Sequence, residues 1–334
     1  MGDVGTTRLE GTEGGGVYVI RATARWLASS IALLFGVTVL TFVLSALAPG
    51  DAAKAMLSGQ TTSYTPEQYQ QLRHELGIDQ PLPAQYWHWL DGLLHGSLGT
   101  DLFSGQPITQ ALNGRLGASL SIIVGTVILS ALVGVAVGVF SAVRGGLAGK
   151  LVNGVSLLGL AAPSFWLSLV LVELLAVQYA VFPATGYTAF GEDPLGWLRS
   201  LALPVIALSA GGSAFIARQT RDAMADVLSR DFIVALRAYG LPLRSIIFKH
   251  ALRNAAIPVV TLLGLLFVGL LGGTVLIETV FAIPGLGQQA VAASSTHNLP
   301  MIEGVAFYFA VIVIIVNLLV DLSYGWLNPK VRKP

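Results

Sequence analysis

The sequence predicts an all-α membrane protein with six transmembrane helices. Of its 334 residues, 54% are hydrophobic and only 11% are charged. Soluble domains average about 25% charged residues, so this composition indicates a chain with several membrane spans. The uncharged runs agree with this, because most approach the ~20 residues that a helix needs to cross a ~30 Å hydrocarbon core.

Charge and cysteine content exclude several other classes. The formal net charge is only +1, so the chain is not expected to bind nucleic acid. The chain has no Cys, which excludes disulfides and thiolate metal sites. Four histidines lie outside the predicted membrane core and are expected to be surface residues, so no metal site is predicted: His74, His88, His95 and His297.

The first 50 residues predict a tail followed by a membrane helix. Residues 1–20 are rich in Gly, Thr and Glu and are predicted to be a disordered cytoplasmic tail. Residues 21–50 hold an uncharged run behind Arg21 and Arg25, and are predicted as the first transmembrane helix. A signal peptide is the alternative, since Ala46-Leu47-Ala48 is similar to a cleavage site. Signal h-regions are only about 7–15 residues long, so the length of the run favours a membrane helix.

Residues 51–115 form a sizeable polar segment, predicted to be extracytoplasmic. Thr65 and Gln68 have capping-box spacing with Pro66 between them, so a helix is expected from there to about Gly77. The aromatic stretch Gln85–Leu90 is typical of a helix at the membrane interface.

Residues 116–328 are predicted to be a permease core of five more membrane helices, and 329–334 a cytoplasmic tail. Gly134 and Gly138 could allow close helix approach, although small residues at this spacing also arise by chance in a chain with 38 Gly. The predicted spans are Leu116–Val143, Leu151–Gln178, Leu201–Ala217, Ala255–Ile277 and Gly304–Val320.

The third predicted span contains two unusual features. Pro163-Ser164 interrupts it, and a proline there frees a backbone carbonyl and permits a bend where helices line a path. Glu173 is the only acidic residue within the span. An intramembrane carboxylate indicates a functional site by default, although a position near the outer end would let it reach water.

Residues 223–256 are the most cationic stretch and predict a helix–glycine–helix segment. Asp231–Tyr239 is predicted to be a short helix that ends at Gly240, a residue suited to the left-handed C′ position. Leu241-Pro242 then starts the next helix. Its apolar stripe is Ile246, Ile247, Ala251 and Leu252, and its polar residues are Arg244, Lys249, His250, Arg253 and Asn254. The alternative is an ordinary basic cytoplasmic loop.

Charge placement predicts which side each loop faces. Fifteen of the 19 Lys and Arg residues fall in the segments that six spans with an inside N-terminus place in the cytoplasm. The four in outer segments are Lys54, Arg73, Arg115 and Arg199. This bias predicts a cytoplasmic segment 223–256 and cytoplasmic termini.

Several separated blocks resemble one family. Arg237–Leu241 and His250–Pro258 are similar to the ARAKGL and HALRNALIPV blocks of the cytoplasmic EAA loop in ABC importer permeases of the dipeptide, oligopeptide and nickel branch. Val234-Ala235-Leu236 departs from the Glu-Ala-Ala signature. Glu278–Gly287 resembles the ETVFxxPGLG block and Pro163–Trp166 the PSFW block.

The resemblance covers roughly residues 21–332 and implies a type I ABC importer permease fold with cytoplasmic coupling helices. It implies that this chain forms half of a translocation pathway for peptides across the plasma membrane of a prokaryote. The other half would come from a second homologous permease, with which the chain would form a heterodimer. Two ABC ATPases and an extracytoplasmic substrate-binding protein would complete the assembly. Arg144–Leu151 lacks the spacing of a Walker A motif, so the sequence predicts no nucleotide site and no cofactor on this chain. The resemblance implies that ATP and magnesium bind to the partner ATPases.

The resemblance also suggests two sets of functional residues. The residues expected to couple the chain to the ATPases are Ala235, Arg237, Ala238, Gly240, Leu241, Arg244, His250, Arg253 and Asn254. Those expected along the translocation path are Pro163, Ser164, Glu173, Pro284 and Gly285.

Three alternatives stay open at this point. A nickel permease is the nearest, because it belongs to the same branch. An ion-coupled secondary transporter would need ionisable residues at mid-membrane, where only Glu173 is a candidate. A membrane enzyme is disfavoured, because no nucleophile–base cluster lies within the spans.

Overall fold

The computed structural model describes residues 13–47, 50–60, 64–146, 149, 154–156, 159 and 161–327. This part of the chain is almost wholly helical, and its only strand-like pairing is an isolated bridge between Thr100 and Pro107. It contains five helices long and apolar enough to cross a membrane. The all-α fold class is therefore confirmed.

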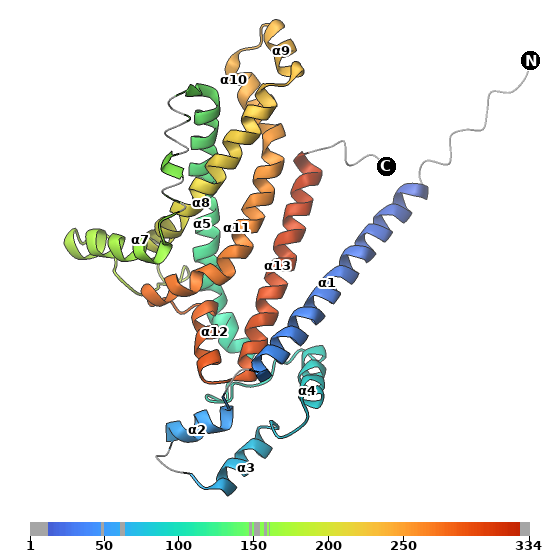
Figure 1. The fold of residues 1–334 in the computed structure, drawn as a ribbon, viewed down its shortest axis with the longest axis vertical. Helices are drawn as coiled ribbons and strands as arrows, with labels where there is room; N and C mark the ends of the chain where they lie inside the picture. The colour runs from blue at the N-terminus through green and yellow to red at the C-terminus, as the bar shows by residue number, and fades with distance from the viewer. Residues whose placement is uncertain are drawn as a thin grey trace, which may run out of the picture.

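The long helices form a bundle, with shorter helices at both ends (Figure 1). The long helices are α1 (Glu13–Leu47), α5 (Ile108–Arg144), α8 (Pro194–Leu228), α11 (Leu252–Val280) and α13 (Leu299–Leu327). The shorter elements are α2 (Ala52–Gln60), α3 (Pro66–Glu75), α4 (Leu82–Leu94), α7 (Ser164–Leu171), the π-helical η1 (Val172–Gln178), α9 (Asp231–Ala238), α10 (Leu243–Ser245), the π-helical η2 (Ile246–Ala251) and α12 (Leu286–Ser295).

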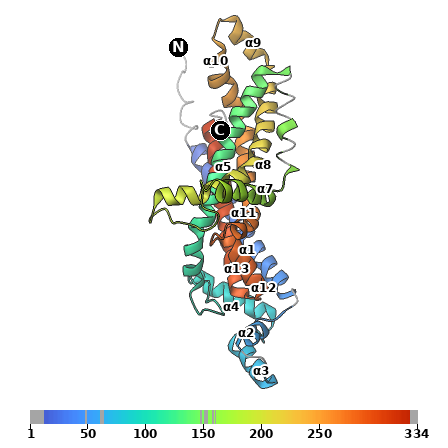
Figure 2. The ribbon, with the colours of Figure 1, turned by 90° about the vertical axis from the view of Figure 1, so that its left-hand side faces the viewer.

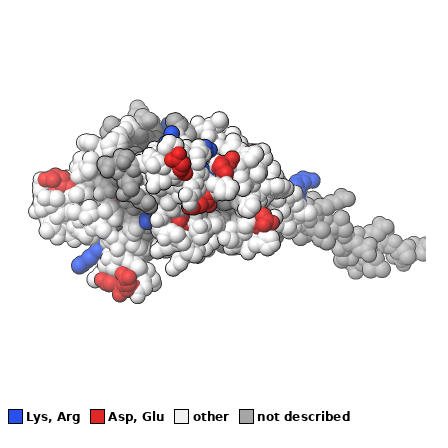
Figure 3. All heavy atoms as spheres, turned by 90° about the horizontal axis from the view of Figure 1, so that it is seen from below, with Lys and Arg blue, Asp and Glu red and all other residues white. Residues whose placement is uncertain are grey.

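The two ends of the bundle differ in structure and charge. Figures 1 and 2 place α9 and α10 at one end and α2, α3 and α4 at the other. Viewed from the α2–α4 end, the surface is mostly uncharged, with acidic side chains in several places and few basic ones (Figure 3). The α9–α10 end carries many of the basic residues, as the charge bias of the sequence predicts.

Glycines bring α5 and α8 into close contact. A Cβ added at Gly134 would lie 2.7 Å from Ile216 Cβ, and one added at Gly138 would lie 2.6 Å from the Ala217 carbonyl oxygen. Real Cβ atoms do not approach this closely, so only glycine fits either position without movement of α8. The prediction of close helix approach at Gly134 and Gly138 is thereby confirmed.

The third predicted span, Leu151–Gln178, is not confirmed as a membrane-crossing helix. Residues 151–153, 157–158 and 160 lie outside the described part of the chain. The described part forms α7 and η1 over Ser164–Gln178, and these 15 residues are too short to cross the core alone. Pro163 marks the break, because it occupies the position before α7 and cannot donate to a preceding turn. Figure 1 shows α7 lying across the bundle.

Several predicted boundaries also move. α1 begins at Glu13, so residues 13–20, predicted as disordered tail, are helical. Extending a helix adds one hydrogen bond per residue, so growth outward from an apolar span is favourable. α5 begins at Ile108 rather than at 116, because Ile108 and Leu112 are fully buried against α12 and α13. Residues 1–12 and 328–334 lie outside the described part.

The predicted helices of the outer segment are present. Thr65 Oγ1 accepts from the Gln68 backbone N–H at 3.3 Å, and Gln68 Oε1 accepts from the Thr65 N–H at 2.9 Å, which completes the capping box. α3 ends at Glu75, and Gly77 follows with φ +67°. α4 contains the aromatic stretch Gln85–Leu90.

A histidine–aspartate pair closes the turn after α3. His74 Nδ1 lies 2.8 Å from Asp79 Oδ2. This hydrogen bond raises the pKa of His74 and lowers the pKa of Asp79. Both groups are charged in the pair, so its stabilisation of the turn weakens as pH rises through the raised His74 pKa. It also weakens as pH falls through the lowered Asp79 pKa.

Replacing Gly138 tests the contact between α5 and α8. We expect Gly138→Val to destabilise the protein by about 1–3 kcal/mol, because the added side chain forces α8 away. Thermal unfolding in detergent measures this. Gly36→Val is the matched control, since a Cβ at Gly36 in helix α1 meets nothing within 4 Å. Equal loss of stability in both variants would contradict the close contact.

An NMR titration tests the pair after α3. We expect the imidazole of His74 to titrate above the usual ~6.5 of a free histidine. Asp79→Asn should return that pKa towards the free value, because the charged acceptor is removed. A His74 pKa unaffected by Asp79→Asn would rule the pair out.

Candidate functional site

Residues 223–256, here called the coupling segment, contain α9, α10 and η2 and are built around one glycine. Gly240 has φ +75°, in the left-handed region that favours glycine. Its N–H donates to the Arg237 carbonyl at 2.9 Å, and the Leu241 N–H donates to the Leu236 carbonyl at 3.2 Å. These two bonds make a Schellman motif, which ends α9 and turns the chain toward α10. The predicted helix–glycine–helix pattern is confirmed.

One face of the coupling segment is buried against the bundle. Ile233 of α9 and Ile246 of η2 are fully buried. They pack with residues at the end of α8 and the start of α11 in one apolar cluster. The buried members of this cluster are Met224, Val227, Ile233, Ile246, Ile247, Ala251 and Ala255. The predicted apolar stripe therefore joins the coupling segment to two long helices.

The opposite face is both apolar and basic. Tyr239 is 84% exposed, and its exposed apolar neighbours are Phe232, Val234, Leu243 and Phe248. The predicted contact residues Ala235, Arg237, Ala238, Gly240, Arg244, Arg253 and Asn254 are also exposed, while Leu241 and His250 are partly buried. Among the described residues, no carboxylate forms a salt bridge with Arg237, Arg244 or Arg253. An exposed face of this kind suits a protein partner.

The coupling segment enters α11 through an irregular turn. η2 is π-helical, so the Leu252 N–H reaches back to the Ile247 carbonyl. Pro258 lies inside α11 and leaves the Asn254 carbonyl without its usual helical donor. The Asn254 side chain donates from Nδ2 to the His250 carbonyl at 2.8 Å, which satisfies an acceptor at this irregularity. Asn254 thus has a structural role as well as an exposed surface.

At the other end of the bundle, a buried carboxylate holds the start of α12. Glu278, at the end of α11, is 0% exposed. Its Oε1 accepts from Ser119 Oγ of α5 at 2.6 Å, and its Oε2 accepts from the Gln288 N–H at 2.8 Å. Ser119 Oγ in turn accepts from the Leu286 N–H at 2.8 Å. A negative charge beside the positive end of a helix is favourable, so Glu278 fixes α12 to α5 and α11.

Glycines leave space for this carboxylate. A Cβ added at Gly285 would meet the carboxyl group of Glu278. A Cβ added at Gly287 would lie 2.7 Å from Val275 Cγ2. Glycine at these two positions lets the chain pass close to Glu278, and the Gln288 N–H that follows reaches its carboxylate. Sequence analysis did not single out Glu278 as a site residue, although an acidic residue at the end of an apolar run is a recognisable signal.

The structure separates the residues predicted along the path into two groups. Pro163 and Ser164 begin α7, and Glu173 is exposed on η1, where Gln178 Nε2 donates to it at 3.3 Å. Pro284 is exposed, and Gly285 is buried beside Glu278. Their lining of a path stays a prediction.

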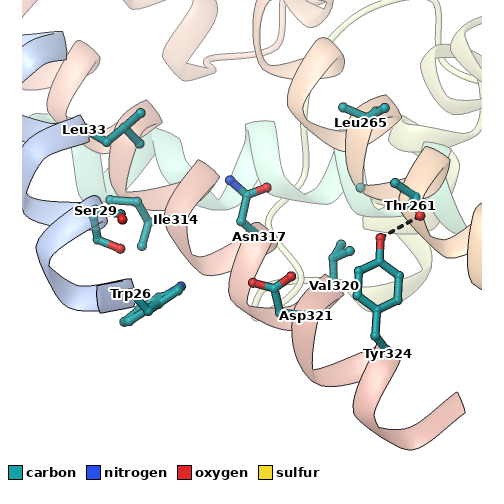
Figure 4. Close-up of a pocket in the computed structure, with 12 residues that line it drawn as sticks. Trp26, Ser29, Leu33, Thr261, Leu265, Ile314, Asn317, Val320, Asp321 and Tyr324 are labelled. Carbon is teal, nitrogen blue, oxygen red and sulfur yellow. Dashed lines mark hydrogen bonds between the residues drawn. The ribbon is translucent and has the colours of Figure 1, made fainter. Parts of the chain in front are cut away.

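A largely apolar hollow with a few polar side chains lies between α1, α11 and α13, with a volume of about 430 Å³. Figure 4 shows Asn317 and Asp321 on one face of α13, with Ser29 and Trp26 of α1 opposite. Tyr324 and Thr261 close one side through a 2.6 Å hydrogen bond between their hydroxyls. The predicted sixth span stopped at Val320, but α13 continues to Leu327, so Asp321 lies on the helix and not in a loop.

Replacing Glu278 tests its hold on α12. Glu278→Gln places an NH₂ group opposite the Ser119 hydroxyl or the Gln288 N–H, so one donor loses its acceptor. We expect the free energy of unfolding to fall by about 1.5–3 kcal/mol. Thermal unfolding in detergent measures it. Glu173→Gln is the matched control, because the same change there affects an exposed side chain. Unchanged unfolding of Glu278→Gln would contradict the assigned role.

Comparisons with known proteins agree with these features. The family model "Binding-protein-dependent transport system inner membrane component" matches residues 134–333, and an N-terminal model for such membrane components matches residues 19–109. The "Probable peptide ABC transporter permease protein y4tP" of Sinorhizobium fredii is 38% identical over 318 residues, covering 95% of this chain and 99% of the relative. The "Dipeptide transport system permease protein DppB" of Escherichia coli K12 is 36% identical over 326 residues, covering 90% of this chain and 96% of the relative.

A solved structure shares the fold. The structure titled "Inward facing conformations of the MetNI methionine ABC transporter" superposes with a TM-score of 0.52 at 18% sequence identity. The match covers 66% of this chain and 97% of that chain. The family model covers more than half of the sequence, and the two relatives match over nearly their whole length. The chain therefore belongs to the binding-protein-dependent transport system inner membrane component family.

Proposed function

We propose that this chain is the permease subunit of a peptide ABC importer and forms half of the pathway across the inner membrane of a prokaryote. The relatives named as peptide and dipeptide permeases support the substrate class. The observation that carries the coupling role is the two-sided coupling segment. One face is buried against α8 and α11, and the other presents apolar and basic side chains to a partner.

The partner proposed for the exposed face is an ABC ATPase. Short amphipathic helices bind grooves through apolar anchors, and Tyr239 and Phe248 are suited to that role. Arg237, Arg244 and Arg253 would contribute charged contacts at the rim. Ala235 and Ala238 are small and exposed, so they would let the partner approach α9 closely.

Motion would pass from the ATPases to the membrane helices through the buried cluster. Ile233, Ile246 and Ala251 are fully buried, so α9 and η2 cannot move without the ends of α8 and α11. Closing of the ATPases would then rock these helices and alternate access to a central path. A second homologous permease would supply the other half of that path, and an extracytoplasmic binding protein would deliver the peptide. ATP and magnesium would act on the ATPases.

The proposed orientation has the coupling segment and both termini in the cytoplasm. The start of α1, the end of α13 and the coupling segment lie toward the same end of the bundle (Figure 1). Basic residues concentrate there, as the positive-inside rule requires. Residues 51–115 would then face the outside and the binding protein.

The alternatives gain less support. The named relatives are peptide permeases, and the described residues hold no group of three or more side chains suited to a metal ion, so nickel is not favoured as the substrate. Glu173 lies exposed on η1, outside the five long helices. It therefore does not provide the mid-membrane carboxylate that ion-coupled transport would need. Pro163, Ser164, Glu173, Pro284 and Gly285 stay proposed path residues of the importer.

Purification from native membranes tests the proposed assembly. A tagged chain should bring down a second permease with several spans and one or two ATPases with Walker A motifs. Addition of the binding protein and a dipeptide to the reconstituted complex should stimulate ATP hydrolysis. Recovery of the chain alone, or only with copies of itself, would overturn the proposal.

Replacing Gly240 tests the coupling turn. We expect Gly240→Val to abolish peptide uptake while the protein still inserts, because a β-branched residue is strained at φ +75°. Gly240→Asn should keep most uptake, because asparagine tolerates this conformation. Gly105→Val is the matched control, since Gly105 has φ +68° in the outer segment and, like Gly240, open space around it. Normal uptake by Gly240→Val would refute the role of the turn.

A further inference from the structure

A second cavity, at the outer end of the bundle, contains polar groups that the coupling mechanism does not use. Its volume is about 370 Å³, and it lies between α3, α4 and the start of α13, with Phe42 of α1 on its wall. This is within the usual range of small-molecule sites, about 300–1,000 Å³. Glu303 of α13, Trp89 and His88 of α4 and Glu75 of α3 also line it.

Glu303 is a buried acid without a partner. It is 1% exposed, and neither carboxylate oxygen accepts a hydrogen bond from the described residues. Burying an unpaired carboxyl group is costly, so buried acids normally have a donor or a counter-ion. Glu278, in the same protein, has such donors for both oxygens. The difference indicates that no described residue serves as the partner of Glu303, so a ligand can take that role.

Trp89 provides the opposite kind of unpaired group. Its indole Nε1 is buried and has no acceptor among the described residues, although tryptophan N–H groups normally find one. Trp89 and Glu303 line the same cavity, so a single ligand could satisfy both. That ligand must carry a positive donor for Glu303 and an acceptor for Trp89.

The walls narrow the choice of ligand. Phe42 and Trp89 offer aromatic surface, which attracts a cation. The cavity lining contains no Lys or Arg, and His74, which also lines it, is paired with Asp79, whose carboxylate offsets the imidazolium charge. The described residues also hold no group of three metal-ligating side chains, which disfavours a metal ion. An ammonium group next to a carbonyl fits these features, and this is the chemistry of the amino end of a peptide.

We propose that this cavity binds the amino-terminal end of a short peptide, with Glu303 pairing the α-ammonium group and the Trp89 N–H donating to the first carbonyl oxygen. The cavity lies at the end of the bundle assigned to the outside, where a peptide would arrive. The choice of a peptide as ligand rests on the proposed function. The binding itself can be measured without transport.

Calorimetric titration of the purified complex, without binding protein or nucleotide, tests the site. The probe is alanyl-alanine amide, which carries the ammonium and carbonyl groups and no carboxylate. We expect it to bind, and its N-acetylated form, which lacks the charge, to show no binding. Glu303→Gln should weaken binding at least tenfold, and Trp89→Phe, which keeps a ring but loses the N–H, several-fold.

The matched control is Glu192→Gln, which removes the same charge from an exposed side chain that does not line the cavity. It should change the affinity less than twofold. Equal binding of the acetylated probe, unchanged affinity in Glu303→Gln, or no binding of the amide would overturn the proposal. If Glu303→Gln fails to fold, Trp89→Phe and the acetylated probe decide the matter.

The same preparation separates this inference from the proposed function. Failure of the ammonium site would leave the ATPases in the complex and peptide-stimulated ATP hydrolysis intact. Failure of the proposed function would remove the ATPases, while titration of the lone chain with the amide probe could still succeed.

Discussion

The burial of Ile233, Ile246 and Ala251 against the ends of α8 and α11 is the contact on which the proposed coupling to the ATPases depends. In the proposed assembly the ATPases bind the ATP, so its energy reaches this chain only through movement, and movement is passed on only where parts are packed without voids. The Schellman turn at Gly240 places α9 and η2 on this one apolar cluster. The exposed side is thereby left free for a partner.

The outer end is held by a different kind of interaction. Glu278 joins α5, α11 and α12 by accepting hydrogen bonds from a hydroxyl and a backbone N–H. The coupling end, in contrast, is held by apolar packing. Directional bonds of this kind fix the start of a helix in one orientation. Glu303, by contrast, lies in the same half of the molecule, and its carboxyl group has no hydrogen-bond partner within the described part of the chain. One acid therefore suits a structural role and the other a binding role.

Much of the fold follows from sequence patterns that depend on near neighbours. The capping box at Thr65, the glycine turn at Gly240 and the apolar stripe of η2 were all predictable, because each arises from residues a few positions apart. The burial of Glu278 depends on Ser119, 159 positions away, and no local pattern contains that contact. The third span stays a prediction, because part of its first half lies outside the described residues and Pro163 divides the run before α7.

The most direct test uses the absence of cysteine from the chain. A single Tyr239→Cys variant places one thiol at the most exposed of the large apolar residues of the coupling segment. A short photoreactive cross-linker attached there should join the chain to an ABC ATPase in native membranes, whereas the same linker on Phe103→Cys, at the outer end, should not. Linkage of both sites to the same partners, or no ATPase at Tyr239→Cys, would contradict the account.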